Sequence, residues 1–150
     1  MKKIHGIILI IVGVLIDQVS KIAVFNNQVN FTIIPNLLNF TLVKNFGAAF
    51  GSFQGANYIL AGVSLLVCAV MVGLIAYMYH KGDKVSFAYY LIIAGGIGNF
   101  IDRIARGFVV DFIDTPFIAT FNLADSFIVI GAFWIIITEV LKSLKVIKEK

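Results

Sequence analysis

Hydrophobic residues form four long runs along the chain, each ended by charged or turn-forming residues. The runs cover about residues 4–25, 58–79, 85–104 and 121–141. A helix of roughly 20 residues crosses the ~30 Å hydrocarbon core of a bilayer. Each run therefore predicts a transmembrane helix. Because the runs leave no room for a separate soluble domain, residues 1–150 are predicted to form one integral membrane domain.

The segment between the first two runs, residues 26–57, has a different pattern. In residues 29–33 and 38–42, apolar and polar side chains alternate, and Pro35 and Asn36 lie between them. Alternation with a period of two is typical of a strand with one buried face, and Pro and Asn favour a turn. The predicted fold class is an all-α membrane protein with four transmembrane helices and a small β-hairpin in its first outer loop. Residues 106–120 are predicted to form a second, shorter outer loop.

The basic residues predict the orientation in the membrane. Eight of the twelve lie before the first run, between the second and third runs, or after the fourth. The remaining four are Lys21, Lys44, Arg103 and Arg106. Lys and Arg accumulate in cytoplasmic loops, so both termini are predicted to be cytoplasmic and the two outer loops extracytoplasmic. No small-x-small cleavage site occurs in the first run before Asp17 and Lys21, so this run is predicted to be a retained helix rather than a signal peptide.

Composition agrees with a membrane protein and excludes several functions. Hydrophobic residues make up 60% of the chain and charged residues 13%, with a mean hydropathy of +0.98, whereas about a quarter of a soluble domain is charged. The single cysteine, Cys68, excludes an intrachain disulfide, and the isolated His5 and His80 disfavour a metal centre. No metal and no cofactor are predicted. Nucleic acid is not a predicted partner, because the basic residues form no patch interleaved with aromatic residues.

Polar residues within the predicted helices point to a functional site, because each costs a few kcal/mol to insert into a bilayer. Counted from the nearest cytoplasmic lysine along a helix, Asp17, Asn99 and Asp125 lie about 21, 22 and 25 Å into the membrane. This shared depth is near the outer boundary of a core about 30 Å thick. The same layer continues through Asp102, Arg103, Arg106 and Asp111. The sequence therefore predicts one polar site near the outer surface.

Several of these residues also have a purely structural interpretation. Asp17 and Lys21 are four residues apart, the spacing of an intrahelical ion pair. Arg103 or Arg106 can anchor a helix end at the membrane interface. Asp102 is close to both in sequence and can balance their charge.

Asp111 and Asp125 are harder to explain structurally. Asp125 has no basic residue within a helical turn, and Asp111 has apolar neighbours on both sides. A lone buried carboxylate is costly unless it is protonated or shares a proton with a second acid. If the two carboxylates lie together, one keeps its proton while the other acts as a base. Aspartic proteases use this arrangement to activate water.

Small and amide-bearing residues fit a cleft around such a pair. Residues 47–51 and 95–98 are rich in glycine, which lets backbones or an extended peptide approach closely. Helix packing explains Gly95 and Gly96 equally well. Asn45, Asn99 and Asn122 can orient carboxylates or bind a peptide backbone, and each can instead be a helix cap.

Five short motifs, taken in order, resemble the motif set of the bacterial lipoprotein signal peptidases, the signal peptidase II family. They are Asp17-Gln18-Val19-Ser20-Lys21, Asn45-Phe46-Gly47-Ala48-Ala49-Phe50-Gly51, Gly98-Asn99-Phe100-Ile101-Asp102-Arg103, Val109-Val110-Asp111-Phe112 and Phe121-Asn122-Leu123-Ala124-Asp125-Ser126. The resemblance implies an intramembrane aspartic endopeptidase of the bacterial cytoplasmic membrane. Such an enzyme removes the signal peptide of a prolipoprotein by cleaving before a diacylglyceryl-modified cysteine.

The resemblance also implies roles for individual residues and partners. Asp111 and Asp125 would be the catalytic pair. The supporting and substrate-binding shell would comprise Asp17, Lys21, Asn45, Gly47, Asn99, Arg103 and Asn122. The implied partners are prolipoprotein signal peptides, membrane lipid and cyclic peptide inhibitors of the globomycin type. Phe46 stands where the family pattern leads us to expect a small or polar residue, which affects the rim of the site.

Two other functions are compatible with a small membrane protein. A proton- or cation-coupled carrier would also use intramembrane acids, but it predicts polar groups across the whole bilayer, and the inner half of every run is apolar. A purely structural membrane subunit would leave Asp125 without a role.

Overall fold

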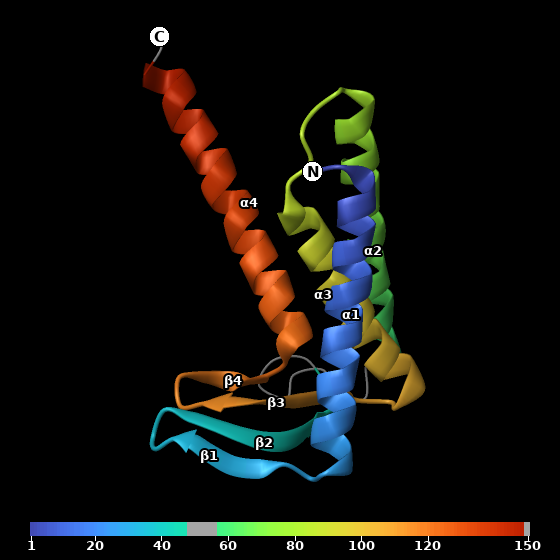
Figure 1. Ribbon diagram of the computed structural model, residues 1–150, viewed down its shortest axis with the longest axis vertical. Coiled ribbons are helices and arrows are strands. Elements are labelled where there is room, and N and C mark those ends of the chain that lie inside the picture. Colours follow the sequence, from blue (N-terminus) through green and yellow to red (C-terminus); the bar gives the residue numbers. More distant parts are fainter. Residues whose placement is uncertain (48–56, 149–150) are drawn as a thin grey trace.

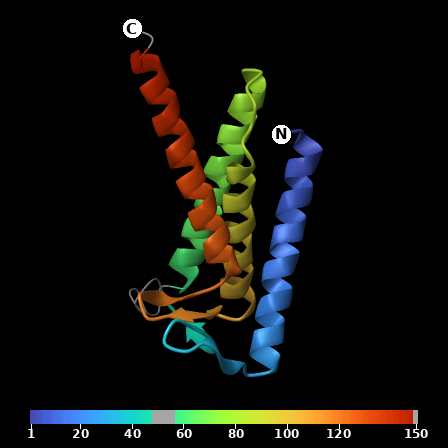
Figure 2. The same cartoon turned by 60° about the vertical axis from the view of Figure 1, so that its left-hand side comes forward.

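The computed structural model describes residues 1–47 and 57–148, which fold into a helical bundle capped at one end by a small sheet (Figures 1 and 2). The helices are α1 (Lys3–Asn26), α2 (Asn57–His80), α3 (Phe87–Ala105) and α4 (Leu123–Lys148). The strands are β1 (Asn30–Ile34), β2 (Leu38–Asn45), β3 (Val109–Thr115) and β4 (Ile118–Phe121). Both termini lie at the end of the bundle that is far from the sheet (Figure 1).

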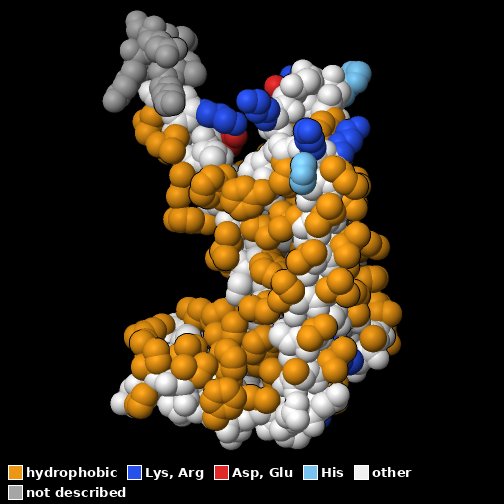
Figure 3. All heavy atoms as spheres, in the orientation of Figure 1, with side chains coloured by type: hydrophobic (Ala, Val, Ile, Leu, Met, Phe, Trp, Pro, Cys, Tyr) orange, Lys and Arg blue, Asp and Glu red, His pale blue; other side chains and the backbone are white. Residues whose placement is uncertain are grey.

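The helices coincide with the four hydrophobic runs, but they are not equivalent. Among the described residues, α1, α2 and the part of α4 at Leu123–Leu144 are long and apolar enough to cross a membrane. The remaining helix, α3, is shorter and packs against α1, α2 and α4. Ten of its 19 residues are buried. Hydrophobic side chains cover the visible surface of the bundle, while Lys and Arg gather near the termini (Figure 3). The architecture is that of a membrane protein built around α3.

Close helix packing depends on glycine at the interfaces of α3. A Cβ atom at Gly95 would lie 2.2 Å from the Ala124 carbonyl oxygen on α4, and one at Gly96 would lie 2.5 Å from Cys68 Sγ on α2. Both distances are far below van der Waals contact. The packing interpretation of Gly95 and Gly96 is therefore confirmed. Cys68 is itself buried in this contact.

The predicted hairpin between the first two helices is present as the antiparallel pair β1–β2. Its turn contains Asn36, whose φ of 60° lies in the left-handed region that Asn tolerates better than most residues. The predicted fold class included only this one hairpin, however, and the structure has a larger sheet. Residues 106–120, predicted to be a loop, contain β3 and most of β4, and the four strands form one antiparallel sheet in the order β1-β2-β3-β4.

Strand β3 escaped prediction because it is a central strand. Val109, Val110, Asp111 and Phe112 are all buried in succession, so they show no alternation between apolar and polar positions. A short continuous apolar run is compatible with a buried strand but does not identify one. Pairing with β2 places Asp111 opposite Val43 and Val110 opposite Lys44.

A small core joins the sheet to the helices. Val24 at the end of α1 packs with Val110 and Phe112 of β3, and Leu42 and Leu123 lie against this cluster. Burial of such side chains contributes about 1.5–3 kcal/mol each. The core fixes β3 across the end of the bundle, which brings the strand carrying Asp111 to the start of α4.

Candidate active site

Polar side chains from helices and strands that are far apart in the sequence meet where the helices join the sheet. Asp111 lies on β3, and Asp125 lies in the first turn of α4. The surrounding predicted residues come from the end of α1, the end of β2, the end of α3 and the segment before α4; they are Asp17, Lys21, Asn45, Gly47, Asn99, Arg103 and Asn122. The tertiary structure thus brings together residues that helical depth placed in one layer and residues that only the resemblance added.

Asp111 is 2% exposed and accepts a hydrogen bond on each carboxylate oxygen. Asn122 Nδ2 donates to Oδ1 at 2.6 Å, and Asn45 Nδ2 donates to Oδ2 at 2.8 Å. Both amides are held in this orientation by backbone donors. Gly47 N donates to Asn45 Oδ1 and Asp125 N donates to Asn122 Oδ1, each at 3.0 Å. The two amide nitrogens must therefore point at Asp111.

Asp125 is partly exposed and is also bound by amides. Asn99 Nδ2 donates to its Oδ1 at 2.7 Å, and the backbone N–H of Asn122 donates to its Oδ2 at 3.3 Å. Asn122 and Asp125 thus form a reciprocal cap at the start of α4. Asn122 combines the two interpretations that the sequence left open, because it caps the helix and binds Asp111.

The pKa of Asp111 is raised to about 6, mainly by burial and also by the negative charge of Asp125, while hydrogen bonds from Asn45 and Asn122 and the charge of Lys21 oppose the increase. A neighbouring carboxylate favours the neutral form of an acid. Asp125 is therefore close enough to favour the protonated form of Asp111.

A network of buried charges lies beneath this pair. Lys21 is fully buried, and its Nζ lies 2.9 Å from Asp17 Oδ2 and 3.3 Å from Asp102 Oδ2. It also donates to Asn99 Oδ1 at 3.0 Å. Arg106 pairs with Asp102 Oδ1. Two carboxylates and two cations therefore balance one another, with Asp17, Lys21 and Asp102 fully buried and Arg106 partly exposed.

The two buried carboxylates of this network hold the backbone beside each member of the pair. Asp17 Oδ1 accepts from the N–H of Ala124, the residue before Asp125, at 3.0 Å. Asp102 Oδ2 accepts from the N–H of Val110, the residue before Asp111, at 3.0 Å. Since Lys21 bridges Asp17 and Asp102, one side chain on α1 links the positions of both aspartates. We call Asp17, Lys21 and Asp102 the positioning triad.

The predicted ion pair of Asp17 and Lys21 is present. Two residues near it, Asp102 and Gln18, make contacts between elements that the sequence did not predict. Asp102, expected to balance nearby charges, is fully buried and joins α1, α3 and β3. Gln18, which the sequence analysis missed, donates to Asp17, Asp102 and the Gly98 carbonyl at 3.1 Å each. Its place beside Asp17 in the first motif was the only available signal.

Gly98 lies where α3 comes closest to Asp17 of α1, and this position has no room for a side chain. A Cβ atom there would lie 2.4 Å from Asp17 Oδ2. Gly98 therefore serves the polar network, unlike Gly95 and Gly96, which serve helix packing. In the other predicted glycine-rich segment, Gly47 is described and residues 48–51 lie outside the described residues.

Arg103 and Phe46 lie at the edge of the site. Arg103 is partly exposed, and its carbonyl accepts from Asn57 Nδ2 at 2.8 Å. The Phe46 side chain is 52% exposed and packs against Phe108, with ring centroids 5.4 Å apart.

A cavity of about 360 Å³ opens beside Asp125. Its other lining residues are Ile118, Phe121, Ser126, Val129 and Ile130, which come from β4 and α4. Figure 3 shows the hollow between the sheet and α4, with hydrophobic side chains on both sides. Within residues 1–47 and 57–148, no three His, Cys, Asp or Glu side chains are grouped to hold a metal ion.

Comparison with known proteins supports the resemblance seen in the motifs. Residues 9–141 match the family described as "Signal peptidase (SPase) II". A protein named lipoprotein signal peptidase from Microcystis aeruginosa is 41% identical over 140 residues, covering 87% of this chain and 88% of its own. The protein of the same name from Clostridioides difficile is also 41% identical over 140 residues, covering 87% and 90%.

Two solved structures, both described as bacterial membrane enzymes, share the fold. One has a TM-score of 0.80 at 32% identity and covers 93% of this chain and 89% of its own. The other has a TM-score of 0.73 at 34% identity and covers 89% and 91%. With a family match over most of its length and relatives near 40% identity, the chain belongs to the signal peptidase II family and is a membrane-embedded peptidase.

Proposed function

We propose that this protein removes signal peptides from prolipoproteins by hydrolysing the peptide bond before a diacylglyceryl-modified cysteine, with Asp111 and Asp125 as the catalytic pair. The observation that carries the proposal is that both carboxylates bind Asn122, one through the amide and the other through the backbone N–H. A single residue therefore sets their relative position. Such fixed geometry is what catalysis by paired acids requires.

The proposed mechanism gives the two acids different roles. Asp111 is the more deeply buried and holds the proton, while Asp125 lies at the cavity and accepts a proton from the attacking water. Water oxygen bonds to the scissile carbonyl carbon as Asp111 gives its proton to the carbonyl oxygen. Collapse of the resulting diol breaks the C–N bond: the leaving amine takes the proton that Asp125 had accepted, and one diol hydroxyl returns its proton to Asp111 as the carboxyl product forms.

The apolar cavity supports a lipid-linked or hydrophobic substrate. Asp125 lies among Ile118, Phe121, Val129 and Ile130, and Val129 and Ile130 are exposed on α4. An apolar chain lying in the bilayer can enter such a cavity without losing its hydrophobic surroundings. The carrier alternative is disfavoured, because the buried polar side chains of the described residues all belong to this one site and none lines a path to the other end.

We expect the purified protein to cleave a diacylglyceryl-modified prolipoprotein at the bond before the modified cysteine. Mass spectrometry of both products identifies the bond. The matched control substrate carries the same sequence with an unmodified cysteine and should be cleaved far more slowly. Absence of cleavage of the modified substrate by protein that remains folded would contradict the proposed function.

We further propose that all four helices cross the membrane, with both termini cytoplasmic and the site near the outer leaflet. A cysteine at Asp83 should then react with a membrane-impermeant thiol reagent only from the cytoplasmic side, and one at Phe117 only from outside. Gly82 is less suitable, because its φ of 77° would strain a residue with a Cβ atom. Cys68 is buried and gives little background. Reversed labelling would place the site on the wrong side for a secreted substrate.

The pKa of Asp111 predicts how activity depends on pH. If Asp111 must carry the proton, kcat/KM should fall as pH rises through about 6. The folded state binds this proton more tightly than the unfolded state, so the free energy of unfolding should also decrease as pH rises from 3.8 to about 6. In Asp111→Asn the free energy of unfolding should no longer show this decrease between pH 3.8 and about 6. A profile unchanged in this variant would show that another group titrates.

A further inference from the structure

A second cavity lies at the opposite end of the bundle from the aspartate pair. It has a volume of about 250 Å³ and lies between the end of α2, the start of α3 and the second half of α4. Here α4 diverges from the other helices (Figures 1 and 2). The cavity contains none of the residues assigned to peptide cleavage, so the proposed function does not explain it.

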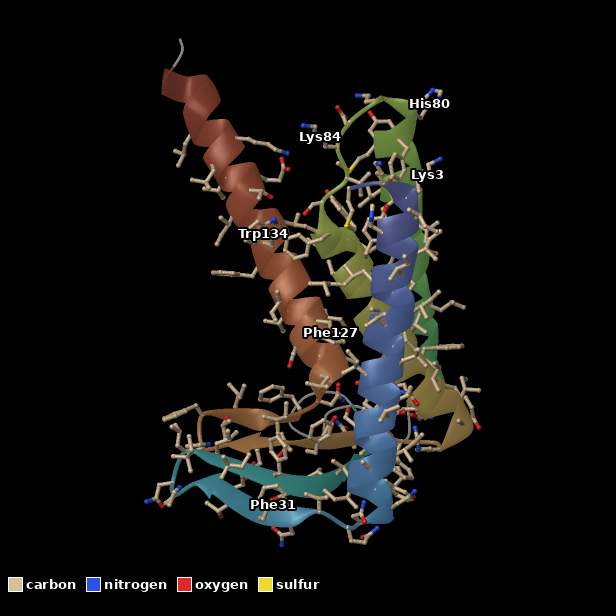
Figure 4. All side chains as sticks on the ribbon, viewed as in Figure 1. Lys3, Phe31, His80, Lys84, Phe127 and Trp134 are labelled. Carbon is tan, nitrogen blue, oxygen red and sulfur yellow. The ribbon has the colours of Figure 1, made fainter. Side chains whose placement is uncertain are left out.

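The walls of this cavity divide into an apolar part and a charged part. Trp134 and Ile135 of α4 and Val85 of the α2–α3 connection form the apolar part. Lys84 and Lys142 lie on opposite sides, on the α2–α3 connection and on α4. Figure 4 shows Lys84 directed toward α4, and it shows Trp134 on α4 farther from the helix ends than Lys84. The cavity is therefore polar toward the helix ends and apolar toward the membrane interior.

The charged part is only partly neutralised by the protein. Lys142 pairs with Glu139 at 2.6 Å, whereas Lys84 has no carboxylate within ion-pair distance among the side chains that the structure describes. Tyr89 and Thr138 add hydroxyl groups to the lining. The N-cap of α3, Ser86, also lines the cavity, which places the positive end of that helix dipole beside it. These features together favour an anion.

We propose that this cavity binds an anionic phospholipid of the inner leaflet, with its phosphate between Lys84 and Lys142 and its proximal acyl chain against Trp134. The proposal rests on the membrane orientation given above. Basic pockets between helices on the cytoplasmic side attract anionic lipid headgroups. On the same helical scale Trp134 lies about 12 Å along α4 from Lys142, which is the depth of an acyl chain rather than of a headgroup. Such a lipid would fill the space that α4 leaves open and hold α4 relative to α3.

Trp134 is the only tryptophan in the chain and so reports on this cavity. Brominated acyl chains quench tryptophan fluorescence on contact. The purified protein is reconstituted in bilayers in which brominated phosphatidylglycerol or brominated phosphatidylcholine replaces part of the lipid. We expect brominated phosphatidylglycerol to give half-maximal quenching at a several-fold lower mole fraction. This preference should decrease at high salt, because it depends on charge.

Three variants decide whether the preference comes from the cavity. The double variant Lys84→Gln/Lys142→Gln and the single variant Lys84→Gln should lose the preference for phosphatidylglycerol. Lys81→Gln removes a cation from the same end of the bundle, outside the cavity, and should retain it. The proposal would be overturned if both lipids quenched the unmodified protein equally. It would also be overturned if Lys81→Gln lost the preference for phosphatidylglycerol as fully as the Lys84 variants. Because the quenching experiment contains no prolipoprotein, a negative result would not count against the proposed peptidase function.

Discussion

Asp125→Asn and Asp111→Asn are each expected to lower the rate of prolipoprotein cleavage by roughly 10⁴-fold or more, the scale seen when one member of a catalytic unit is removed. Each variant removes a group that must carry or accept a proton. The double variant should lose little more than either single variant, because neither acid works alone. Single-turnover cleavage of the modified prolipoprotein measures the step directly.

The hydrogen bonds predict that these two variants differ in stability. Both oxygens of Asp111 accept short bonds from amide nitrogens at 2.6 and 2.8 Å, so an asparagine there must place its NH₂ against another NH₂. At Asp125 the NH₂ of an asparagine can face the longer contact with the backbone N–H of Asn122, at 3.3 Å. Asp125→Asn should therefore be the more stable of the two variants.

Asp114 provides a matched control on the same strand as Asp111. It accepts hydrogen bonds from Asn39 and Thr120, away from the pair. Asp114→Asn should retain activity close to that of the unmodified protein. If Asp111→Asn or Asp125→Asn remained folded in membranes with near-normal activity, the assignment of the catalytic pair would be wrong.

Lys21→Met is expected to have the largest effect on stability, lowering the free energy of unfolding by about 3–5 kcal/mol. Lys21 is the cation closest to Asp17 and also neutralises Asp102, and all three side chains are fully buried. Methionine matches the length of the side chain but leaves a buried carboxylate without a cation. Thermal unfolding in detergent, followed by a thiol-reactive dye that detects exposure of Cys68, measures the loss. Lys142→Met, which breaks an exposed pair, should unfold at an almost unchanged temperature.

Variants of Asp17 separate positioning from chemistry. Asp17→Ala removes the acceptor for Ala124 N and should reduce both stability and activity, the latter only in part. Asp17→Asn keeps a hydrogen-bonding group of the same shape, so its effects should be milder. Complete loss of cleavage in an Asp17 variant with unchanged stability and substrate affinity would instead make Asp17 a third catalytic acid.

Features that depend on local pattern could be predicted from the sequence. Hydrophobic runs of fixed length specify the helices, and the alternation in residues 29–33 and 38–42 specifies the first hairpin. The depth of Asp17, Asn99 and Asp125 along their helices placed them in one layer, because helical rise is constant. The predicted layer also contained Asp111, so the sequence was enough to predict one polar site near the outer surface.

The contacts that join these groups, in contrast, depend on how distant segments pack in the folded chain. The second hairpin was not predicted, because β3 is buried along its length and lacks alternation. The bond from Ala124 N to Asp17 spans 107 residues of sequence, and the bond from Gln18 to Asp102 spans 84. Local periodicity carries no information about such pairs. Asn122 could be recognised as a candidate cap or ligand, but its double role depends on β3 lying beside the start of α4. That proximity is fixed by packing of Val24, Val110 and Phe112, whose hydrophobic attraction has no direction and therefore leaves no pairing signal in the sequence.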